Sequence, residues 1–544
     1  MEDLLNEVLN YLIGKGLACV IEDGRIKIRN NISGKDVLLY CQLDKHFPYT
    51  LPKIYIDNES KKIFAPIPHL NTDNSVCVYD KSVVIPNFNR PLELIYDTIK
   101  DAIEVLRKGI DRENKDDFID EFVAYWHSQT SIIAESFIDT MEVAKKIYWC
   151  TFRDKKIIIA DSKVRLREIN CALFNKEYEI REGLLIPILL EKFKKIPQKD
   201  VEIIEMVESA SEYSKQYSDF LQHNIDNNVL VLFSIVGNDN NINFGWYHHG
   251  PGVPNGFRRG KVNLKYAYGF KKNLGEKILI ENCYQTRLFK RGGDGFGTAW
   301  KKVCVIGCGS IGSFLIDALK YSGTEKFCLV DNEMVGYENI ARHTAGYFGV
   351  TFPKTTILKY NLEQWNPNIV CDEYYEDAHD FLENNQDVIN GCDILFVAVA
   401  SATVEHHLNR IILDDKINVP VVLIWVEPFC IGGHAIVIRK KQNLYGTIFD
   451  DKDLSFVHTI VKDDHKYSQR EAGCQSSYIP YSAFYIQQFL YSILNYMRAD
   501  IIHQKGNYRL SWCGSISNAK IYDIEINDGY KGANDFTIIC ERID

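Results

Sequence analysis

The chain has 544 residues, 46% hydrophobic and 25% charged, a balance typical of globular proteins and long enough for about three to four domains. Lys and Arg number 63 against 73 Asp and Glu, so the formal net charge is −10. This charge gives no reason to expect general binding of nucleic acid.

The first residues, MEDLLNEVLNYLIGKG, lack the basic start of a signal peptide, and the longest apolar runs, such as 394–400, are much shorter than a membrane span. We therefore expect a soluble, cytoplasmic protein without a membrane or nucleic-acid partner. The 15 cysteines include no CxxC pair, which favours neither a paired-cysteine zinc site nor a regular disulfide framework. Most of them are expected to be reduced thiols.

The N-terminal region predicts a helix followed by an antiparallel meander. Residues 1–16 carry apolar positions at helical spacing and end at Gly14 and Gly16. The next apolar runs predict strands, an α+β start, at 17–21, 25–28, 36–43 and 53–56. A turn bracketed by prolines, 46–52, separates the last two strands and holds the chain extended.

A polar loop, 66–78, then contains one cysteine, Cys77, preceded by His69, Asn71 and Asn74. These groups could orient a substrate carbonyl or donate to an oxyanion, whereas a cysteine taken alone is usually a small buried hydrophobe. The order of helix, meander, FPYTLP turn, histidine loop, cysteine and a helix at 92–106 resembles the ubiquitin-conjugating fold. The resemblance implies that Cys77 carries a thioester, that Asn71 or Asn74 is the oxyanion donor, and that His69 braces the loop. The family's His-Pro-Asn reads His-Leu-Asn here, in a slightly shorter loop.

The first domain is expected to span 1–130, with an amphipathic helix end at 118–126 whose aromatic residues belong to its core. A middle domain follows at 131–294, because its apolar periodicity is too regular for a flexible linker. It predicts strands at 156–160 and 229–236 and helices at 182–195 and 201–216.

One stretch of the middle domain, 246–261, combines histidines, turn residues and basic residues. Metal binding by His248 and His249 would need further ligands, so a surface turn is favoured. Arg258, Arg259 and Lys261 could contact a partner protein, but a solvated loop is the default.

The C-terminal region, 295–544, opens with a strand, a glycine turn, a helix and a second strand over 302–331. The turn glycines Gly307, Gly309 and Gly312 would let the backbone approach a phosphate, which the N-terminus of the following helix would bind. Asp331, which ends the second strand, would accept hydrogen bonds from a ribose. The alternative is that the glycines serve only a tight turn.

Asn339, Arg342 and Lys354 follow within one short segment and would place two cations and an amide beside the phosphates. A dehydrogenase would not need them, whereas nucleotidyl transfer does, since negative charge develops on the pyrophosphate leaving group. With the three glycines and Asp331, this set resembles the adenylation core of ubiquitin-activating enzymes and their ThiF- and MoeB-type bacterial relatives. The resemblance implies that ATP, usually with Mg, activates the C-terminal carboxylate of a protein as an acyl adenylate.

The metal ligands stay unknown, because Ala400 or Ser401 occupies the place of the aspartate that helps hold Mg in that family. An acidic residue from elsewhere would substitute for it, or phosphates and water would hold the metal. Arg342 and Lys354 would then provide more of the charge stabilisation.

A strand at 421–425 and a loop at 467–480 follow, and this loop contains Cys474 ahead of a helix at 482–497. An accessible cysteine near a helix start favours the thiolate. The resemblance implies that Cys474 is the acceptor cysteine of the activating domain; a buried structural cysteine is the alternative.

Together these features predict a multidomain α/β protein with a conjugating domain, a middle domain and a Rossmann-like activating domain. This domain order resembles the fused ligases of CBASS antiphage operons, which attach a cyclic-oligonucleotide synthase of the CD-NTase (cGAS-like) kind through its C-terminus to other molecules. That resemblance implies the synthase as donor, a protein or small-molecule amine as target, a homodimer and an antiviral role. Conjugation of a bacterial ubiquitin-like protein, a sulfur-carrier adenylyltransferase and a nucleotide-sensing scaffold remain alternatives.

Overall fold

The computed structural model of the protein describes most of the chain. The described residues are 2–64, 67, 69–71, 73–79, 83–111, 113, 126, 130, 132–139, 141–152, 156–189, 197–236, 242–270, 275–292, 299–470, 477–500 and 506–543. The chain forms two compact units, Met1–Ser162 with Glu179–Asn282 and Lys163–Tyr178 with Cys283–Asp544.

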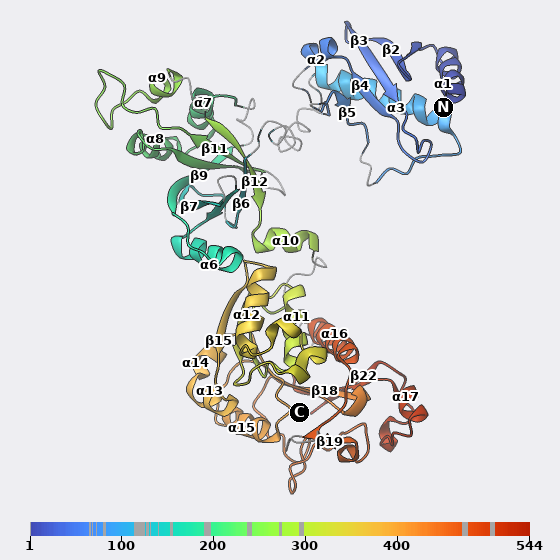
Figure 1. The fold of residues 1–544 in the computed structure, drawn as a ribbon, viewed down its shortest axis with the longest axis vertical. Coiled ribbons are helices and arrows are strands. Elements are labelled where there is room, and N and C mark those ends of the chain that lie inside the picture. Colours follow the sequence, from blue (N-terminus) through green and yellow to red (C-terminus); the bar gives the residue numbers. More distant parts are fainter. Residues whose placement is uncertain are drawn as a thin grey trace. The chain divides into compact units, whose positions relative to one another are not determined.

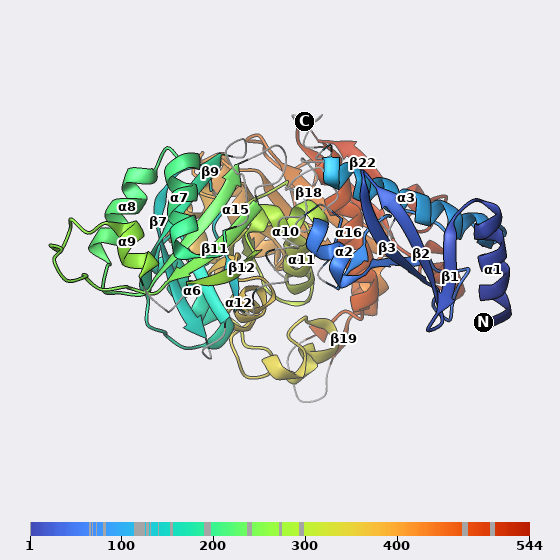
Figure 2. The same ribbon diagram turned by 90° about the horizontal axis from the view of Figure 1, so that it is seen from above.

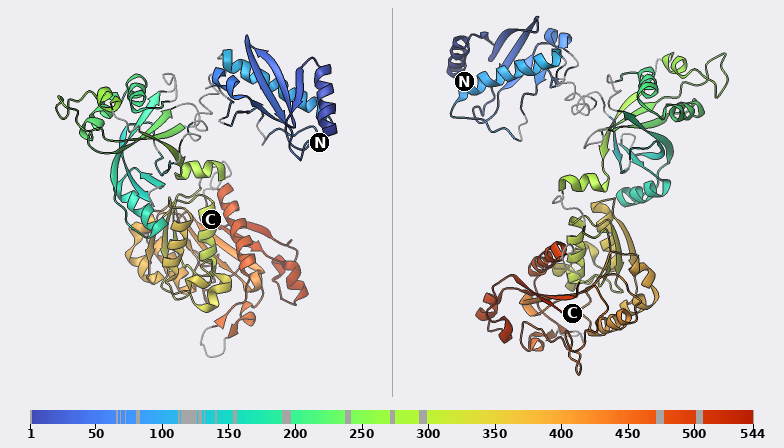
Figure 3. Two further views of the ribbon diagram at one scale, coloured as in Figure 1. Left: turned by 45° about the horizontal axis from the view of Figure 1, so that its top comes forward. Right: turned by 180° about the vertical axis from the view of Figure 1, so that it is seen from behind.

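The N-terminal part of the first unit is a five-stranded antiparallel sheet in the order β1-β2-β3-β4-β5, covered by helices. Its strands are β1 (Ala18–Glu22), β2 (Arg25–Ile32), β3 (Lys35–Gln42), β4 (Lys53–Ile56) and β5 (Ser75–Val76), and its helices are α1 (Glu2–Gly14), α2 (Asn58–Phe64) and α3 (Pro91–Asp111). Figures 1 and 3 show α3 lying across one face of the sheet. Alternate strand residues such as Ile26 and Ile28 are buried beneath it, as a half-buried strand requires. The predicted helix and meander are confirmed.

The other part of the first unit is a seven-stranded barrel in the order β10-β11-β12-β6-β8-β7-β9. Its strands are β6 (Ile132–Ser136), β7 (Lys145–Phe152), β8 (Lys156–Ala160), β9 (Arg181–Leu189), β10 (Val229–Val236), β11 (Ile242–His248) and β12 (Glu276–Asn282). Three helices, α7 (Asp200–Ala210), α8 (Ser214–His223) and α9 (Leu264–Gly269), share a core with the inner residues of β9 to β11 (Figure 2).

Three predictions for this region are wrong. Residues 182–189 of the helix predicted at 182–195 belong to the strand β9, and 190–195 lie outside the described residues. The run Gly183–Ile188 is buried on both faces of β9 and therefore has no period that distinguishes strand from helix. The helix at 201–216 is interrupted by Ser211, which adopts an extended backbone between α7 and α8. Trp126 is a core residue of the barrel, not of the first domain, and its indole N–H donates to the carbonyl oxygen of Ile278 at 2.8 Å. Residues 118–125 lie outside the described residues.

The prediction that His248 lies in a surface turn is also wrong, because this residue is fully buried at the end of β11. Its Nδ1 lies 2.7 Å from the carboxylate of Asp200, and its Nε2 lies 2.9 Å from the hydroxyl of Tyr217. Asp200 also accepts from the indole of Trp246 at 2.8 Å, so the imidazole is one member of a buried polar network. His249, by contrast, is partly exposed and pairs with Glu276.

The second unit is built on an eight-stranded sheet in the order β15-β14-β13-β16-β17-β18-β21-β22. The first five strands are parallel and the last three antiparallel. They are β13 (Lys302–Ile306), β14 (Lys326–Val330), β15 (Val370–Tyr374), β16 (Ile394–Val397), β17 (Val421–Val426), β18 (Gly432–Ile438), β21 (Tyr508–Cys513) and β22 (Thr537–Arg542). This part confirms the predicted Rossmann-like α/β class.

Helices cover both faces of this sheet. Residues of α11 (Ser310–Tyr321), α12 (Lys354–Trp365) and α16 (Ala483–Asp500) share one core with one set of strand side chains. Residues of α13 (Ala378–Asn384), α14 (Gln386–Asn390) and α15 (Ala402–Leu413) share a second core with the opposite set. The strands therefore alternate between two cores, as expected for the middle layer of three.

Helix α6 (Lys163–Phe174), from the expected middle domain, belongs to the second unit. It packs on α12, and the guanidinium of Arg165 donates to the carbonyl oxygen of Pro367 at 2.6 Å. The domain limits at 130 and 294 remain predictions. No helix in the described parts of the chain has the length and hydropathy needed to span a bilayer.

Candidate functional site

The glycine turn after β13 leaves room for an anion. Gly307 has a positive φ of 90°, and a Cβ there would lie 2.8 Å from the carbonyl oxygen of Ala398. A Cβ on Gly312 would overlap the carbonyl oxygen of Gly307, whereas Gly309 has no atom within 4 Å of its Cβ position. Two glycines therefore serve packing, and the third borders open space at the N-terminus of α11.

The first turn of α11 is itself uncapped. Its N-cap, Gly309, offers no side-chain acceptor, and the hydroxyl of Ser310 is buried without a hydrogen-bond partner. The free N–H groups of a helix start, together with its dipole, suit a phosphate. Both the open space and the unused donors are found where the sequence predicted phosphate binding.

Asp331 follows β14 and faces the same turn. One carboxylate oxygen accepts from the backbone N–H of Cys308 at 2.7 Å, and the other accepts from the N–H of Glu333 at 2.8 Å. Burial raises the pKa of this carboxyl group, and the nearby charge of Lys354 opposes part of the rise. Each oxygen still has a lone pair, so the carboxylate can also accept from a ribose hydroxyl.

The 3₁₀ segment η2 (Tyr337–Arg342) is held over the turn by the residue that follows it. The buried His343 has its Nε2 2.9 Å from the carbonyl oxygen of Cys308, and its Nδ1 accepts from the N–H of Ala345 at 3.1 Å. This pattern requires a neutral imidazole, and burial lowers the pKa of His343 accordingly. The hydrogen bond places the residues next to His343 beside the glycine turn.

The predicted amide and cations take different partners. Asn339 closes its own turn by accepting from the N–H of Gly336 at 2.9 Å. Arg342 donates to the hydroxyl of Tyr481 at 3.2 Å, with its guanidinium 5.5 Å from the centre of that ring. Lys354, at the start of α12, is 5% exposed and pairs with Glu333. Asp331, Arg342 and Lys354 thus come from three separate segments to the region of one turn.

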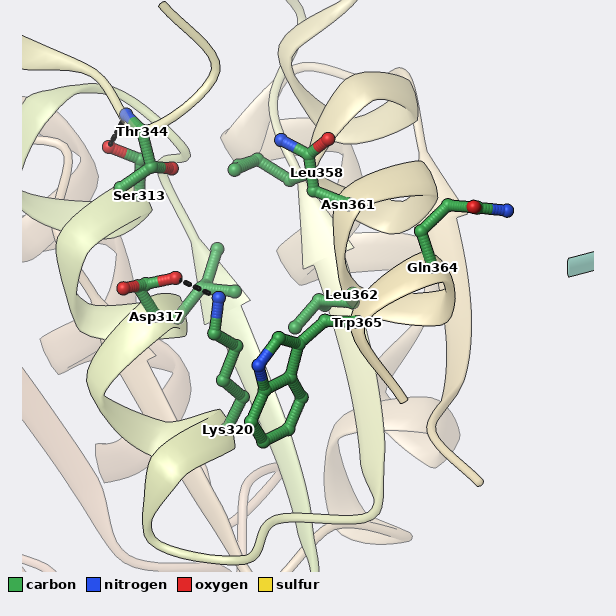
Figure 4. A pocket seen from close by; sticks show the side chains of 10 residues that line it. Ser313, Asp317, Lys320, Thr344, Leu358, Asn361, Leu362, Gln364 and Trp365 are labelled. Carbon is green, nitrogen blue, oxygen red and sulfur yellow. Dashed lines mark hydrogen bonds and ion pairs between the residues drawn. The ribbon is translucent and has the colours of Figure 1, made fainter. Parts of the chain in front are cut away.

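A polar groove between α11 and α12, with a cavity of about 250 Å³, continues from this region (Figure 4). Its hydroxyl-lined end is formed by Ser313, whose Oγ accepts from the N–H of Thr344 at 3.4 Å. At its other end Lys320 pairs with Asp317 and lies 5.2 Å from the ring of Trp365. The Ser313–Thr344 contact ties the segment after η2 to α11, which fixes Arg342 relative to the turn.

The two residues at the position expected for a magnesium ligand, Ala400 and Ser401, carry no carboxylate. Ala400 follows β16 in the left-handed conformation, with φ 49°, and Ser401 is the N-cap of α15. Within the described ranges no group of three or more His, Cys, Asp or Glu side chains could hold a metal ion. Glu405, in the first turn of α15, is buried, which raises its pKa to about 7.

Cys77 lies directly after β5 and is exposed. Its backbone N–H donates to the carbonyl oxygen of His69 at 2.7 Å, which joins the two ends of the loop. Leu70 and Val76 form a β-bridge inside that closure. His69 therefore braces the loop through its backbone, and the thiol sits at the rim of the loop, where a partner can reach it.

The two candidate oxyanion donors are held differently. The amide of Asn74 is fixed at both ends, since its Nδ2 donates to Asn58 at 2.7 Å and its Oδ1 accepts from Lys61 at 2.7 Å. Among the described residues, the Nδ2 of Asn71 donates one hydrogen bond, to the hydroxyl of Ser75 at 2.9 Å. An amide nitrogen carries two hydrogens, so Asn71 keeps a donor for a further acceptor.

Cys474 lies outside the described residues, but the ends of its loop are described. β19 (Gln469–Arg470) pairs antiparallel with β20 (Ser477–Tyr478), and Tyr478 donates to the side chain of Gln469 at 2.7 Å. In the sequence, Cys474 falls between these two strands, and α16 begins five residues after β20.

Three residues of this site were missed by the sequence analysis: Glu333, His343 and Tyr481. His343 adjoins Arg342, and its position in the segment that carries the amide and both cations was the one available signal. The roles of Glu333 and Tyr481 depend on contacts with Lys354 and Arg342 that no local pattern predicts.

Two segments of the chain match known families. Residues 298–479 match the ThiF family, and residues 18–134 match prokaryotic E2 family B. The first match supports an ATP-dependent adenylating activity in the C-terminal unit. The second supports transfer chemistry and a protein partner at the N-terminal domain, where Cys77 is located.

Similar proteins cover only part of the chain. The tRNA threonylcarbamoyladenosine dehydratase of Haemophilus influenzae is 28% identical over 173 residues, 31% of this chain and 62% of that protein. The uncharacterized protein y4oA of Sinorhizobium fredii is 25% identical over 178 residues, 33% of this chain and 24% of that protein. The chain therefore spans less than two thirds of the length of each relative.

Solved structures show partial similarity. Escherichia coli MccB with MccA-N7isoASN has a TM-score of 0.30 at 16% identity, covering 45% of this chain and 64% of that chain. The E. coli dehydratase TcdA in complex with AMP has a TM-score of 0.21 at 24% identity, covering 23% and 51%. One polypeptide therefore contains a segment that matches prokaryotic E2 family B and a segment that matches the ThiF family.

Proposed function

We propose that the protein is an ATP-dependent ligase that activates the C-terminal carboxylate of a partner protein and passes it over Cys474 and then Cys77 to a target amine. The observation that carries the proposal is the presence, in one chain, of a ThiF-family domain and an E2-like domain with an exposed cysteine after β5. Fusion raises the effective concentration of one thiol near the other, up to roughly millimolar for a short linkage.

In the first step a carboxylate oxygen of the partner attacks the α-phosphorus of ATP, and the bond to the β-phosphate oxygen breaks to release pyrophosphate. Backbone N–H groups at Gly309 and Ser310 would bind the phosphates, and Asp331 the ribose. Arg342 and Lys354 would stabilise the charge that develops on the leaving group. Magnesium, held mainly by phosphates and water, would neutralise further charge.

In the following steps the acyl group moves between nucleophiles. The Cys474 thiolate attacks the acyl carbon of the adenylate, and AMP leaves. The Cys77 thiolate then attacks the same carbon in the Cys474 thioester, and Cys474 leaves as a thiolate. Finally the target amine attacks the acyl carbon of the Cys77 thioester and loses a proton, and the Cys77 thiolate is released. Asn71 would donate to the oxyanion formed at Cys77.

The donor we favour is a cyclic-oligonucleotide synthase of an antiphage operon, with a homodimeric ligase, because the order of the domains resembles that of the CBASS ligases. A small ubiquitin-like protein is the alternative donor. A sulfur-carrier adenylyltransferase would use the ThiF-family domain alone and would not need Cys77.

The test is to incubate the full chain with ATP, Mg and each candidate donor, then to run non-reducing gels on wild type, Cys474→Ala and Cys77→Ala. We expect wild type to form a thiol-sensitive adduct with the donor. Cys474→Ala should form no adduct, and Cys77→Ala should form only the adduct on Cys474. Cys171→Ala, a change of another exposed cysteine, is the matched control. Adducts unchanged in both active-cysteine variants would overturn the two-thiol relay.

A further inference from the structure

A large apolar cavity in the second unit has no role in the steps above. Its volume is about 690 Å³, within the range of roughly 300–1,000 Å³ typical of ligand sites. Its lining is mostly aromatic and aliphatic and includes Phe429, Ile431, Tyr467, Tyr485, Tyr522 and Ile524. Exposure of apolar walls of this extent to water is unfavourable, and an apolar group that fills the cavity lowers the free energy.

The cavity opens at the edge of the sheet where ligands of parallel strands bind. Phe429 belongs to η4 (Pro428–Cys430), which follows the carboxyl end of β17, and β17 runs parallel to β16 and β13. The backbone of Phe429 has φ 58°, a costly conformation for a residue with a side chain, and its N–H donates to the carbonyl oxygen of Pro480 at 2.6 Å. The fold thus holds this ring at the cavity against a local preference.

The cavity also borders the adenylation residues. Tyr481 lies in its wall and accepts the hydrogen bond from Arg342. His343, which follows Arg342 in the sequence, contacts the glycine turn at the carbonyl oxygen of Cys308. Two hydrogen bonds, joined by the peptide link between Arg342 and His343, therefore lead from the turn to the cavity. A group that enters the cavity lies close to the cation proposed to act on the phosphates.

The strand order separates this cavity from the nucleoside side of the site. Asp331, the ribose acceptor, follows β14, which lies on one side of β13. β16 and β17, the latter leading to Phe429, lie on the other side. With the phosphates at the turn after β13, the nucleoside extends toward β14, and the partner that attacks the α-phosphorus approaches from the side of β17.

The described residues on either side of the segment that contains Cys474 line the same cavity. Tyr467 lies two positions before β19, and Pro480 lies two positions after β20; both line the cavity. An acyl group that leaves the nucleotide for Cys474 would therefore belong to a chain already seated here.

We propose that this cavity binds one or more bulky apolar side chains close to the C-terminal carboxylate of the donor protein. The inference rests on the proposed function and deepens it, because it defines the chemistry of the donor tail. A tail of glycines alone would leave the cavity filled with water and would lose the apolar contacts of Tyr485, Tyr522 and Ile524. The donor is thus a protein whose last residues include aromatic or branched aliphatic side chains, recognised before the carboxylate reaches ATP.

The test uses the full chain and two fluorescently labelled heptapeptides with free carboxyl ends, identical except that one ends in bulky apolar residues and the other in glycines. Binding is followed by fluorescence anisotropy without ATP, and activation by ATP–pyrophosphate exchange. We expect the apolar peptide to bind at least about tenfold more tightly than the glycine peptide and to support faster exchange.

Two neighbouring residues provide matched variants. Tyr522 and Ile521 are both 72% exposed, but only Tyr522 lines the cavity. Tyr522→Ala should weaken binding of the apolar peptide about fivefold without changing that of the glycine peptide, and Ile521→Ala should change neither. Asn518→Trp, which fills the cavity from the helix α17 (Ile516–Ile521), should block the apolar peptide alone.

The outcomes separate the two proposals. Equal or tighter binding of the glycine peptide, or equal effects of Tyr522→Ala and Ile521→Ala, would overturn the cavity inference. Binding that depends on Tyr522 without pyrophosphate exchange for any peptide would support the cavity and overturn adenylation. Exchange with the glycine peptide alone would support adenylation and overturn the inference.

Discussion

The glycine turn after β13 and the loop of Cys77 perform successive steps in the proposed reaction, but they are built in opposite ways. Around the turn, Asp331, His343 and Lys354 are buried or half-buried and already engaged in hydrogen bonds or ion pairs. Around Cys77, the loop is closed by backbone contacts and the thiol is exposed. Charge stabilisation requires preorganised groups shielded from water, whereas acyl transfer between two thiols requires access.

The largest effect is expected from substitutions at the glycine turn. Gly312→Ala should destabilise the second unit by about 3 kcal/mol or more and abolish ATP binding, because the new Cβ overlaps the carbonyl oxygen of Gly307. Gly309→Ala, with open space at its Cβ position, should leave the thermal midpoint unchanged and weaken ATP binding. Differential scanning fluorimetry and nucleotide titration measure both effects. Equal midpoints for the two variants would contradict the packing role of Gly312.

Removal of a cation should have the next largest effect. Arg342→Ala should lower ATP–pyrophosphate exchange about 10²–10³-fold, since it deletes a cation proposed to stabilise the charge on the leaving group. Lys301→Ala, at the amino end of β13 and exposed, is the control and should leave exchange unchanged. If the two variants exchange equally well, Arg342 serves only to pack on Tyr481.

The buried acid on α15 predicts a pH dependence of stability in the second unit. Burial raises the pKa of Glu405 to about 7, above its ordinary 4.5. The unfolded chain therefore loses this proton first, so the stability present below about pH 4.5 declines as the pH rises to 7, by about 3 kcal/mol in total. Glu405→Gln should remove this decline.

Denaturant unfolding of wild type and Glu405→Gln at pH 5 and pH 8.5 tests this expectation. The variant should be the more stable protein at pH 8.5, and the exposed Glu338→Gln should behave as wild type. A wild-type stability that does not fall between the two pH values would show that ionised Glu405 is compensated.

The smallest effect distinguishes the two amides of the Cys77 loop. Asn71→Ala should slow transfer from Cys77 to an amine about tenfold without slowing the loading of Cys77, because Asn71 keeps an amide donor. Asn74→Ala should instead loosen the loop, as should Asn58→Ala, which removes the same contact from α2. Single-turnover discharge assays and thermal midpoints separate the two roles; slow discharge for Asn74→Ala alone would reverse them.

The elements themselves were largely determined by the sequence. Helix and strand periods, the glycine turn and the acidic strand end are local patterns, and they correctly predicted the meander of the first domain and the strand-turn-helix of the second unit. The prediction failed at β9, where burial on both faces erases the period, and at 201–216, where Ser211 divides one apolar pattern between two helices.

The contacts between distant residues were decided only by the tertiary structure. The sequence could not indicate that His248 closes a buried network with Asp200, that Trp126 packs in the barrel, or that Tyr481 receives Arg342. The apolar cavity likewise gathers Phe429, Tyr485 and Tyr522 from separate elements. Local residues determine which segment becomes a helix or a strand, but the partner of each side chain depends on the packing of segments far apart in the chain.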